Sequence, residues 1–303
     1  MAGRSHVALK WLLVAGCATL LAGACGLSGG TADSSGKVQV VAAENFWGSI
    51  AAQVGGNRVE VTSIITNPDT DPHSYEATPE DARLIATARY VIVNGAGYDP
   101  WAAKLAAANP VSDRRMLDVA NLNGVAEGGN PHMWYSPDFV TRVSERITAD
   151  LQELDSTDAG YFDQQSSLYR TTGLKRYHDT IATIKQKYSG TRVGASESIF
   201  AYMSPALGLD LITPAEYMKA ISEGTDPSAA DKATVDEQVT TRQIKVFVFN
   251  SQNSTPDVQS LVSKARAAGI PVVQITETLS PANLTFQDWQ TNQLEALLKA
   301  LGG

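Results

Sequence analysis

Hydrophobic positions follow two alternating patterns along the chain from Val38 onward. Short apolar runs typical of buried strands are each followed by a segment with helical spacing, and strands that alternate with helices predict a mostly parallel sheet with helices on both faces. In the first half we expect strands at Val38–Ala43, Val59–Ile65, Tyr90–Asn94 and Met116–Val119. We expect helices at Asn45–Val54, Pro79–Ala88 and Pro137–Leu154.

The same alternation begins again after residue 190. The segment between the halves, Asp158–Tyr188, has helix-compatible spacing and is longer than a typical globular helix, although Gly173 weakens it and allows a bend or break. In the second half we expect strands at Arg192–Ala195, Leu209–Ile212, Lys245–Asn250 and Pro271–Ile275, and helices at Ile199–Ala206, Ala230–Thr241, Pro256–Ala268 and Phe286–Leu301.

These patterns predict an α/β protein with two doubly wound parallel-sheet lobes. The first lobe covers residues 38–157, a connector helix covers 158–188, and the second lobe covers 189–303. The chain has 303 residues and is 43% hydrophobic, which is enough for two domains with cores of their own. A net charge of -8 argues against nucleic acid as a partner.

The first 25 residues have the composition of an export signal. Arg4 and Lys10 form a basic start, and Trp11–Ala24 is a short apolar stretch. Leu21–Cys25 (LAGAC) matches a bacterial lipobox, which predicts lipidation of Cys25 and attachment to the outer face of the cytoplasmic membrane. A match ending at Cys17 leaves a shorter apolar stretch, and an ordinary cleaved signal is the other alternative. Residues 26–37 then form a Gly/Ser-rich flexible tether.

Two stretches of the chain share an unusual pattern. Asn67–Asp81 and Asn130–Asp138 both contain Pro-His-x-aromatic followed by Ser/Thr-Pro-acidic. The second part of each pattern is a helix start, with Thr78 or Ser136 as N-cap residue and proline at the first helical position. Each stretch therefore holds one histidine, His73 and His132, on a loop just before a helix.

Polar residues that follow strands complete a candidate metal site. Ligands bind outside the carboxyl ends of strands in open parallel sheets, and Glu197 and Glu277 follow the first and last predicted strands of the second lobe. With His73 and His132 they suit a divalent ion such as manganese, iron or zinc. The alternatives are a solvated or capping role for each histidine, a helix N-terminal position for Glu197 and an ordinary loop acid at Glu277.

Other motifs give little support for chemistry. Gly95-Ala-Gly97 lacks the third glycine of a dinucleotide-binding loop, and the chain contains no GxxxxGK[ST], HExxH or CxxC motif. Trp47, Trp101 and Trp134 are expected to pack in the interior, and His178 is expected to be exposed on the connector.

The sequence resembles the metal-binding solute-binding lipoproteins of ATP-binding-cassette importers, in the manganese/zinc cluster of ZnuA-, TroA- and PsaA-like proteins. The resemblance covers about Val38 to Leu301. The segments that carry it are DPHSYEATPED, NGAGYDPW, NPHMWYSP, SESIF, ISEGTDPSAADKATVDEQV and ITETLSP.

The resemblance implies four ligands for one transported ion. They are His73, His132, Glu197 at a position that holds histidine or glutamate, and Glu277 at a position that is usually aspartate. Zinc-dedicated members often have a histidine-rich loop, whereas residues 95–130 contain no histidine. This absence and the glutamate at position 197 favour manganese or iron over a dedicated zinc site.

We therefore expect a lipid-anchored, monomeric receptor that is not an enzyme. It binds one divalent ion, manganese or zinc with iron as a third candidate, and delivers it to the ABC permease of the same uptake system. The rival functions are a metal-dependent hydrolase and a surface adhesin.

Overall fold

The computed structural model describes residues 36–68, 70 and 75–303. Residues 1–35, which hold the predicted signal, Cys25 and most of the predicted tether, lie outside the described residues, and so does His73. Gly36–Gly303 form one compact unit. Within the described ranges, none of the helices combines the length and the apolar composition that a membrane span requires.

The first lobe is built on a four-stranded parallel sheet with the strand order β2-β1-β3-β4. The central strands β1 and β3 are covered on both faces, which explains why β3 is a continuous apolar run and β1 is apolar except at Gln39 and Glu44. The strands are β1 (Val38–Glu44), β2 (Val59–Ile65), β3 (Tyr90–Val93) and β4 (Arg115–Asp118).

The second lobe repeats this arrangement. Its sheet has the order β6-β5-β7-β8, and all of its pairs are parallel. In both sheets, therefore, the first strand of the lobe lies between the second and the third. The strands are β5 (Arg192–Ala195), β6 (Asp210–Leu211), β7 (Phe247–Asn250) and β8 (Val272–Ile275). The predicted pair of parallel-sheet α/β lobes is confirmed.

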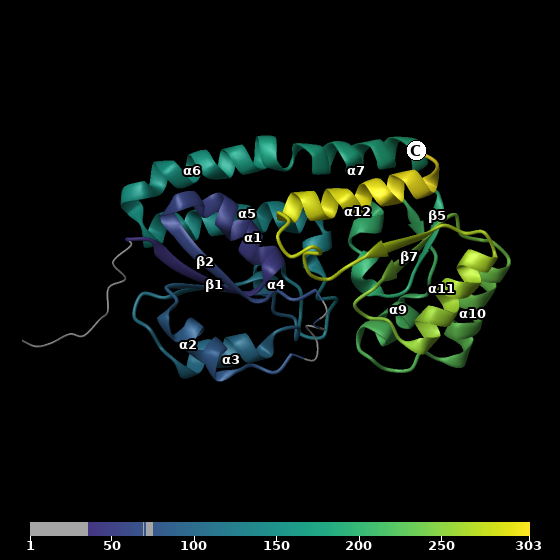
Figure 1. Ribbon diagram of the computed structural model, residues 1–303, viewed down its shortest axis with the longest axis horizontal. Helices are drawn as coiled ribbons and strands as arrows, with labels where there is room; N and C mark the ends of the chain where they lie inside the picture. The colour runs from purple at the N-terminus through teal and green to yellow at the C-terminus, as the bar shows by residue number, and fades with distance from the viewer. Residues whose placement is uncertain (1–35, 69, 71–74) are drawn as a thin grey trace, which may run out of the picture. The chain divides into compact units, whose positions relative to one another are not determined.

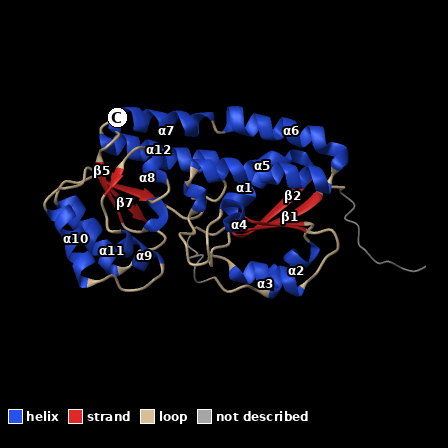
Figure 2. Ribbon diagram, turned by 180° about the vertical axis from the view of Figure 1, so that it is seen from behind, coloured by secondary structure: helices blue, strands red, loops and turns tan. Residues whose placement is uncertain are grey.

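Helices cover both faces of each sheet (Figure 2). In the first lobe, α1 and α5 pack on one face of the sheet and α2 and α3 on the other, where a smaller hydrophobic cluster lies. The first-lobe helices are α1 (Asn45–Gly55), α2 (Pro79–Thr87), α3 (Pro100–Ala108), α4 (Val119–Asn123) and α5 (Pro137–Leu154). The second-lobe helices are α8 (Met203–Ala206), α9 (Ala215–Ser222), α10 (Ala229–Thr240), α11 (Pro256–Ala267) and α12 (Phe286–Leu301).

The connector between the lobes consists of two helices laid end to end, α6 (Ala159–Leu168) and α7 (Lys175–Tyr188), as Figure 1 shows. A single wider π turn, Tyr169–Gly173, separates them. This turn includes Gly173, the position at which the sequence allows a bend or break. A side chain at this position would lie 3.3 Å from the ring of Tyr169, so the glycine allows the turn to pack closely.

Both predicted helix starts have the expected caps. The Thr78 hydroxyl accepts a hydrogen bond from the Asp81 amide, and the Asp81 carboxylate accepts one from the Thr78 amide, which completes a capping box. The Ser136 hydroxyl accepts from the Phe139 amide. These caps fix where the loops that precede α2 and α5 must end.

One face of α1 joins the first lobe to the second. Asn45, Ser49 and Gln53 are spaced by four residues and therefore lie on one side of the helix. Asn45 Oδ1 accepts from the Leu279 amide at 3.1 Å, and Ser49 Oγ accepts from the Phe286 amide at 2.9 Å. Gln53 and Gln287 are joined through their side-chain amides. The main hydrophobic core is also continuous, from β1 in the first lobe to α12 in the second.

Candidate metal site

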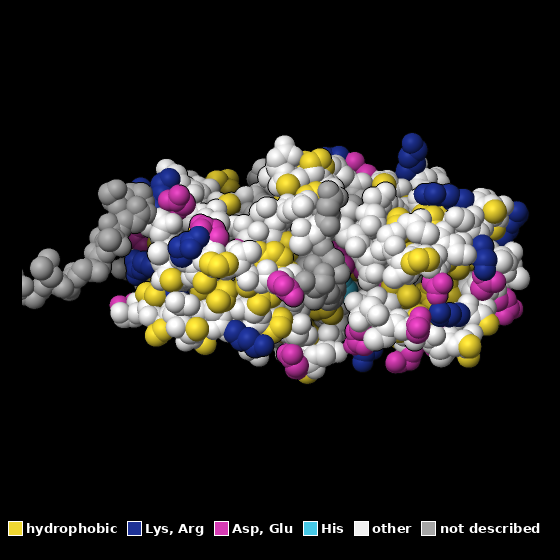
Figure 3. Space-filling view, turned by 60° about the horizontal axis from the view of Figure 1, so that its bottom comes forward, with side chains coloured by type: hydrophobic (Ala, Val, Ile, Leu, Met, Phe, Trp, Pro, Cys, Tyr) yellow, Lys and Arg dark blue, Asp and Glu magenta, His cyan; other side chains and the backbone are white. Residues whose placement is uncertain are grey.

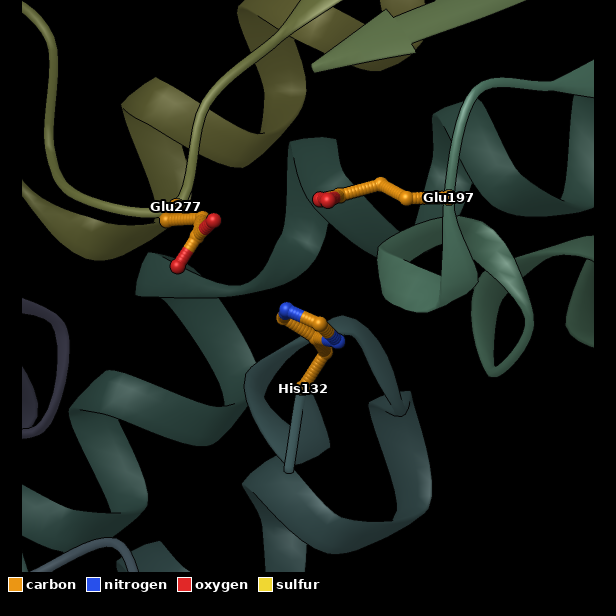
Figure 4. A group of neighbouring side chains, drawn as sticks. All are labelled: His132, Glu197 and Glu277. Atoms are coloured by element: carbon orange, nitrogen blue, oxygen red, sulfur yellow. The ribbon is translucent and has the colours of Figure 1, made fainter. Parts of the chain in front are cut away.

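Three side chains from separate segments point toward one another between the sheets (Figure 4). Glu197 and Glu277 each lie two residues beyond the end of a second-lobe strand, β5 and β8, and His132 precedes the helical turn Met133–Tyr135. One nitrogen or oxygen ligand atom from each lies within 4.8 Å of the others. All three side chains are at most 1% exposed.

The ring of His132 is held in one tautomer by Asn130. Asn130 Oδ1 accepts a hydrogen bond from the His132 backbone amide at 3.1 Å and lies 2.8 Å from the ring Nδ1. Because this oxygen can only accept, Nδ1 carries the proton and the lone pair lies on Nε2. The ring also makes edge contacts with Trp134 and Tyr98, which keep its surroundings apolar.

The His132 loop is anchored to the second lobe. Asn130 Nδ2 donates to the carbonyl of Ser198 at 2.8 Å, and Tyr202 Oη donates to the carbonyl of Asn130 at 3.1 Å. Ser198 directly follows Glu197 in the chain. The segment that carries the imidazole and the segment that carries one carboxylate are therefore fixed to each other.

The two carboxylates accept hydrogen bonds from neutral donors. Asn250 Nδ2 lies 2.5 Å from Glu197 Oε1 and 2.8 Å from Glu277 Oε1. Asn253 Nδ2 donates to Glu197 Oε2 at 2.7 Å, and Tyr98 Oη donates to Glu277 Oε2 at 2.7 Å. A buried carboxylate without such donors is costly. These donors satisfy the carboxylate oxygens without adding a positive charge that would compete with a cation.

Gln252 organises the backbone next to the site. Its Oε1 accepts from the amides of Glu277 and Thr278 at 2.6 and 2.9 Å, and its Nε2 donates to the carbonyl of Pro68 at 2.5 Å. The loop Asn250–Asn253, which we call the amide loop, thus contacts both carboxylate segments and the first lobe. It begins at the last residue of β7, the strand between those that precede Glu197 and Glu277.

A second pair of acids consists of Glu44, the last residue of β1, and Asp99, the residue before α3. Asp99 accepts from the amides of Asn94 and Gly95 at 2.6 and 2.8 Å, so its carboxylate is well solvated by the backbone. Burial and the adjacent Asp99 raise the pKa of Glu44 well above its usual value, and burial raises the pKa of Asp99 to about 6. Both carboxyl groups therefore keep their protons to a higher pH in the folded protein than in the unfolded chain.

The structure brings together three of the four predicted ligands, while His73 lies outside the described residues. Their role as ligands stays a prediction. His178 is exposed, as expected, and Trp47 and Trp134 are fully buried. Sequence reasoning missed the amide loop. The signal was the polar Asn250 at the end of the apolar run Phe247–Asn250, at the same sheet edge as the glutamates.

Charged side chains of both signs are spread over the face of the protein seen in Figure 3. One cavity of about 340 Å³ lies next to the site and is bounded by Asn130 and Ser198. A site for a bare ion needs little volume, so the buried cluster itself is the better candidate for metal binding.

A family model described as zinc-uptake complex component A, periplasmic, matches residues 40–300. The high-affinity zinc uptake system protein ZnuA of Bacillus subtilis is 24% identical over 319 residues, covering 96% of this chain and 98% of that protein. The manganese ABC transporter substrate-binding lipoprotein PsaA of Streptococcus pneumoniae is 26% identical over 254 residues, covering 77% of this chain and 78% of that protein.

Solved structures agree on the fold. A manganese-bound periplasmic metal-binding protein from Candidatus Liberibacter asiaticus superimposes with a TM-score of 0.73 at 19% identity. The match covers 88% of this chain and 100% of the other. At this identity the likeness concerns the two-lobed architecture.

Proposed function

Since the chain belongs to the family of the periplasmic zinc-uptake component A, we propose that it is the substrate-binding receptor of an ABC importer for a divalent transition-metal ion. It captures one ion outside the cytoplasm and delivers it to the permease of the same uptake system. The observation that carries this proposal is the buried group of His132, Glu197 and Glu277. Buried acids and an imidazole that converge in this way match the ligands that such ions take.

The ligands are His132 through Nε2, and Glu197 and Glu277 through carboxylate oxygens. His73 is the proposed fourth ligand. It belongs to the segment that follows Pro68, whose carbonyl is held by Gln252 of the second lobe. Binding in this manner makes and breaks no covalent bond. The two curated relatives compared above are both named as uptake components, which supports a receptor rather than a hydrolase or an adhesin.

Manganese and zinc are the candidate ions, with iron as a third. Of the two curated relatives, one is named for zinc and the other for manganese. Two carboxylates make this ligand set harder than one rich in imidazole, which favours manganese. Zinc has a higher intrinsic affinity than manganese for nitrogen and oxygen ligands. The supply of each ion outside the cell therefore also influences which ion the protein carries.

We further propose that residues 1–25 are a lipoprotein signal, that Cys25 carries the lipid, and that residues 26–37 are the tether. The mature protein is then a monomer attached to the outer face of the cytoplasmic membrane. Labelling with a radioactive fatty acid tests the anchor, and the Cys25→Ser variant should lose the label and leave the membrane fraction. Retention of the label in this variant would contradict the assignment of Cys25.

Metal counting tests the receptor function. Residues 26–303 contain the whole compact unit. They are stripped with chelator, offered equimolar manganese, iron(II) and zinc, and analysed by native mass spectrometry. We expect one ion per chain, and we expect the alanine variants of His132, Glu197 and Glu277 to lose it. If the unmodified chain binds no ion stoichiometrically, the proposed function is wrong.

A further inference from the structure

Asn250 stands at the centre of the second-lobe edge that carries the two glutamates. It is the last residue of β7, which lies between β5 and β8 in the sheet. The pairing of Ala195 with Val248 sets Asn250 beside the chain that continues to Glu197, and Asn250 itself pairs with Ile275 of β8. The side chain therefore has one acidic segment on each side.

The orientation of the Asn250 side-chain amide is fixed by its hydrogen bonds. Its side-chain Oδ1 accepts a hydrogen bond from the Gln252 backbone N–H at 3.0 Å. The backbone N–H of Asn250 donates to Ser196 Oγ at 3.1 Å, which holds the residue in place. A flipped amide would point its oxygen at two carboxylates and its NH₂ group at an N–H donor. The nitrogen must therefore face Glu197 and Glu277, and its two protons match the two carboxylate oxygens.

We propose that Asn250 is a positioning residue of the metal site, which sets the separation and orientation of the Glu197 and Glu277 carboxylates before the ion arrives. This inference rests on the receptor function proposed above. One nitrogen at 2.5 and 2.8 Å from the two Oε1 atoms ties carboxylates from separate strands to one point. Asn250 is itself fully buried, so this point is rigid.

An uncharged amide suits this task better than other side chains. Lysine or arginine would also donate to both acids, but a fixed positive charge would take the place of the ion. Aspartate would add a third negative charge and remove both donors. Leucine has a similar size but offers no hydrogen bond. Asparagine alone among these holds both carboxylates and leaves their charge for the cation.

Without the amide, each glutamate is free to turn and to change how it contacts an ion. We therefore expect the Asn250→Leu variant to bind manganese about 10- to 100-fold more weakly, as is common when a group that orients a ligand is removed. We also expect a changed geometry around the ion. A visible absorption spectrum of bound cobalt(II) reports this, because band positions and intensity depend on coordination number.

The matched control is Gln238→Leu, in the same lobe. Gln238 is also buried and donates through Nε2 to the Ile212 carbonyl at 2.8 Å, away from the metal cluster. Both variants lose a buried amide, but only Asn250→Leu should weaken manganese binding and alter the cobalt spectrum. If the unmodified chain binds one ion and Asn250→Leu keeps both the affinity and the spectrum, Asn250 has no positioning role and the receptor function stands.

A measurement on the unmodified chain covers the case in which Asn250→Leu does not fold. In a nitrogen-15 correlation spectrum of residues 26–303, the two Asn250 side-chain protons should both shift when one equivalent of zinc is added. The side-chain signals of Gln238 should stay in place. Stoichiometric zinc binding without a shift of the Asn250 protons would overturn the inference, whereas failure of zinc, manganese and cobalt(II) all to bind would overturn the receptor function instead.

Discussion

Tyr98 of the first lobe donates a hydrogen bond of 2.7 Å to Glu277 Oε2 of the second lobe, and both side chains are buried. The phenol therefore fixes one carboxylate from across the boundary between the lobes. Together with Asn250 it occupies both oxygens of Glu277 with donors that carry no charge. A candidate ligand of one lobe thus depends on a residue of the other.

Removal of this phenol should weaken both stability and metal binding. In Tyr98→Phe the ring still packs against Trp134, but a buried carboxylate oxygen loses a donor. We expect the free energy of unfolding to fall by about 1–3 kcal/mol, measured by denaturant titration of metal-free protein. Isothermal titration should also show weaker metal binding.

The control for Tyr98→Phe is Tyr161→Phe. Tyr161 Oη accepts from the Asn57 amide at an exposed position away from the metal cluster. This control should leave metal affinity unchanged. Equal metal affinity in both variants would show that the cross-lobe bond does not orient Glu277.

Loss of the Asn130 side chain should weaken metal binding without unfolding the protein. In Asn130→Ala the ring of His132 loses the acceptor that holds its proton on Nδ1, and the loop loses its link to Ser198. We expect affinity to fall about 10- to 100-fold in competition with a metal-sensitive dye. Asn123→Ala, which removes a side-chain bond to the Val119 carbonyl in α4, should bind as the parent does. An unchanged affinity in Asn130→Ala would mean that the tautomer does not depend on Asn130.

The buried acid pair should make stability fall as the pH rises. Glu44 and Asp99 both have raised pKa values, so the folded protein holds protons that the unfolded chain has released. Their stabilisation is complete below the ordinary carboxyl pKa of about 4 and is lost as the pH rises through the folded values. For Asp99 that loss runs from the ordinary carboxyl pKa of about 4 to the folded pKa of about 6, and for Glu44 it extends higher.

The Glu44→Gln variant tests this pH dependence. Its side-chain amide does not titrate in this range, so the stability of the variant should fall less between pH 5 and pH 8 than that of the parent. Denaturant unfolding at several pH values measures the difference, which can grow by up to about 1.4 kcal/mol per pH unit for each proton involved. The exposed Glu60→Gln change should leave the slope as it is. Parallel pH profiles for the parent and Glu44→Gln would argue against a raised pKa of Glu44 in the folded protein.

Replacement of Glu197 by histidine should move the preference from manganese toward zinc. The change exchanges a hard carboxylate for an imidazole in the proposed ligand set. In a mixture of equimolar ions, native mass spectrometry should find less manganese on Glu197→His than on the parent, by about tenfold or more relative to zinc. Glu216→His, at an exposed position, serves as the control. Zinc alone on both the parent and Glu197→His would contradict a site tuned toward manganese.

Sequence patterns predicted the main elements because the central strands are mostly apolar and the helix starts at Thr78 and Ser136 have side-chain caps. Three helices were missed for physical reasons. Helix α4 has five residues, too few to show a helical repeat of hydrophobic positions. Helix α3 is rich in alanine, so its buried and exposed faces differ little in hydrophobicity. Helix α9 follows Pro214 and lies between a two-residue strand and a loop, so no flanking pattern marks it.

The acidic residues and histidines of the candidate site could be predicted from the sequence, but its uncharged residues could not. Glu197 and Glu277 were found because each follows an apolar run, and His132 because its motif is duplicated. Asn250 was not, because an uncharged residue at a strand end is common and its partners are 53 and 27 residues away in the chain. Asn130 belongs to the His132 motif, but its contact with Ser198 depends on how the two lobes meet.

The polar face of α1 and the shared hydrophobic core have a consequence for the timing of transport. Asn45, Ser49 and Gln53 bind the second lobe at three successive turns, so the lobes separate only if several contacts break together. An ion held between them would have a long residence time in the isolated receptor. Such a protein can collect a scarce ion and keep it during diffusion along the membrane. Unloading would then be governed by the encounter with the permease rather than by spontaneous escape.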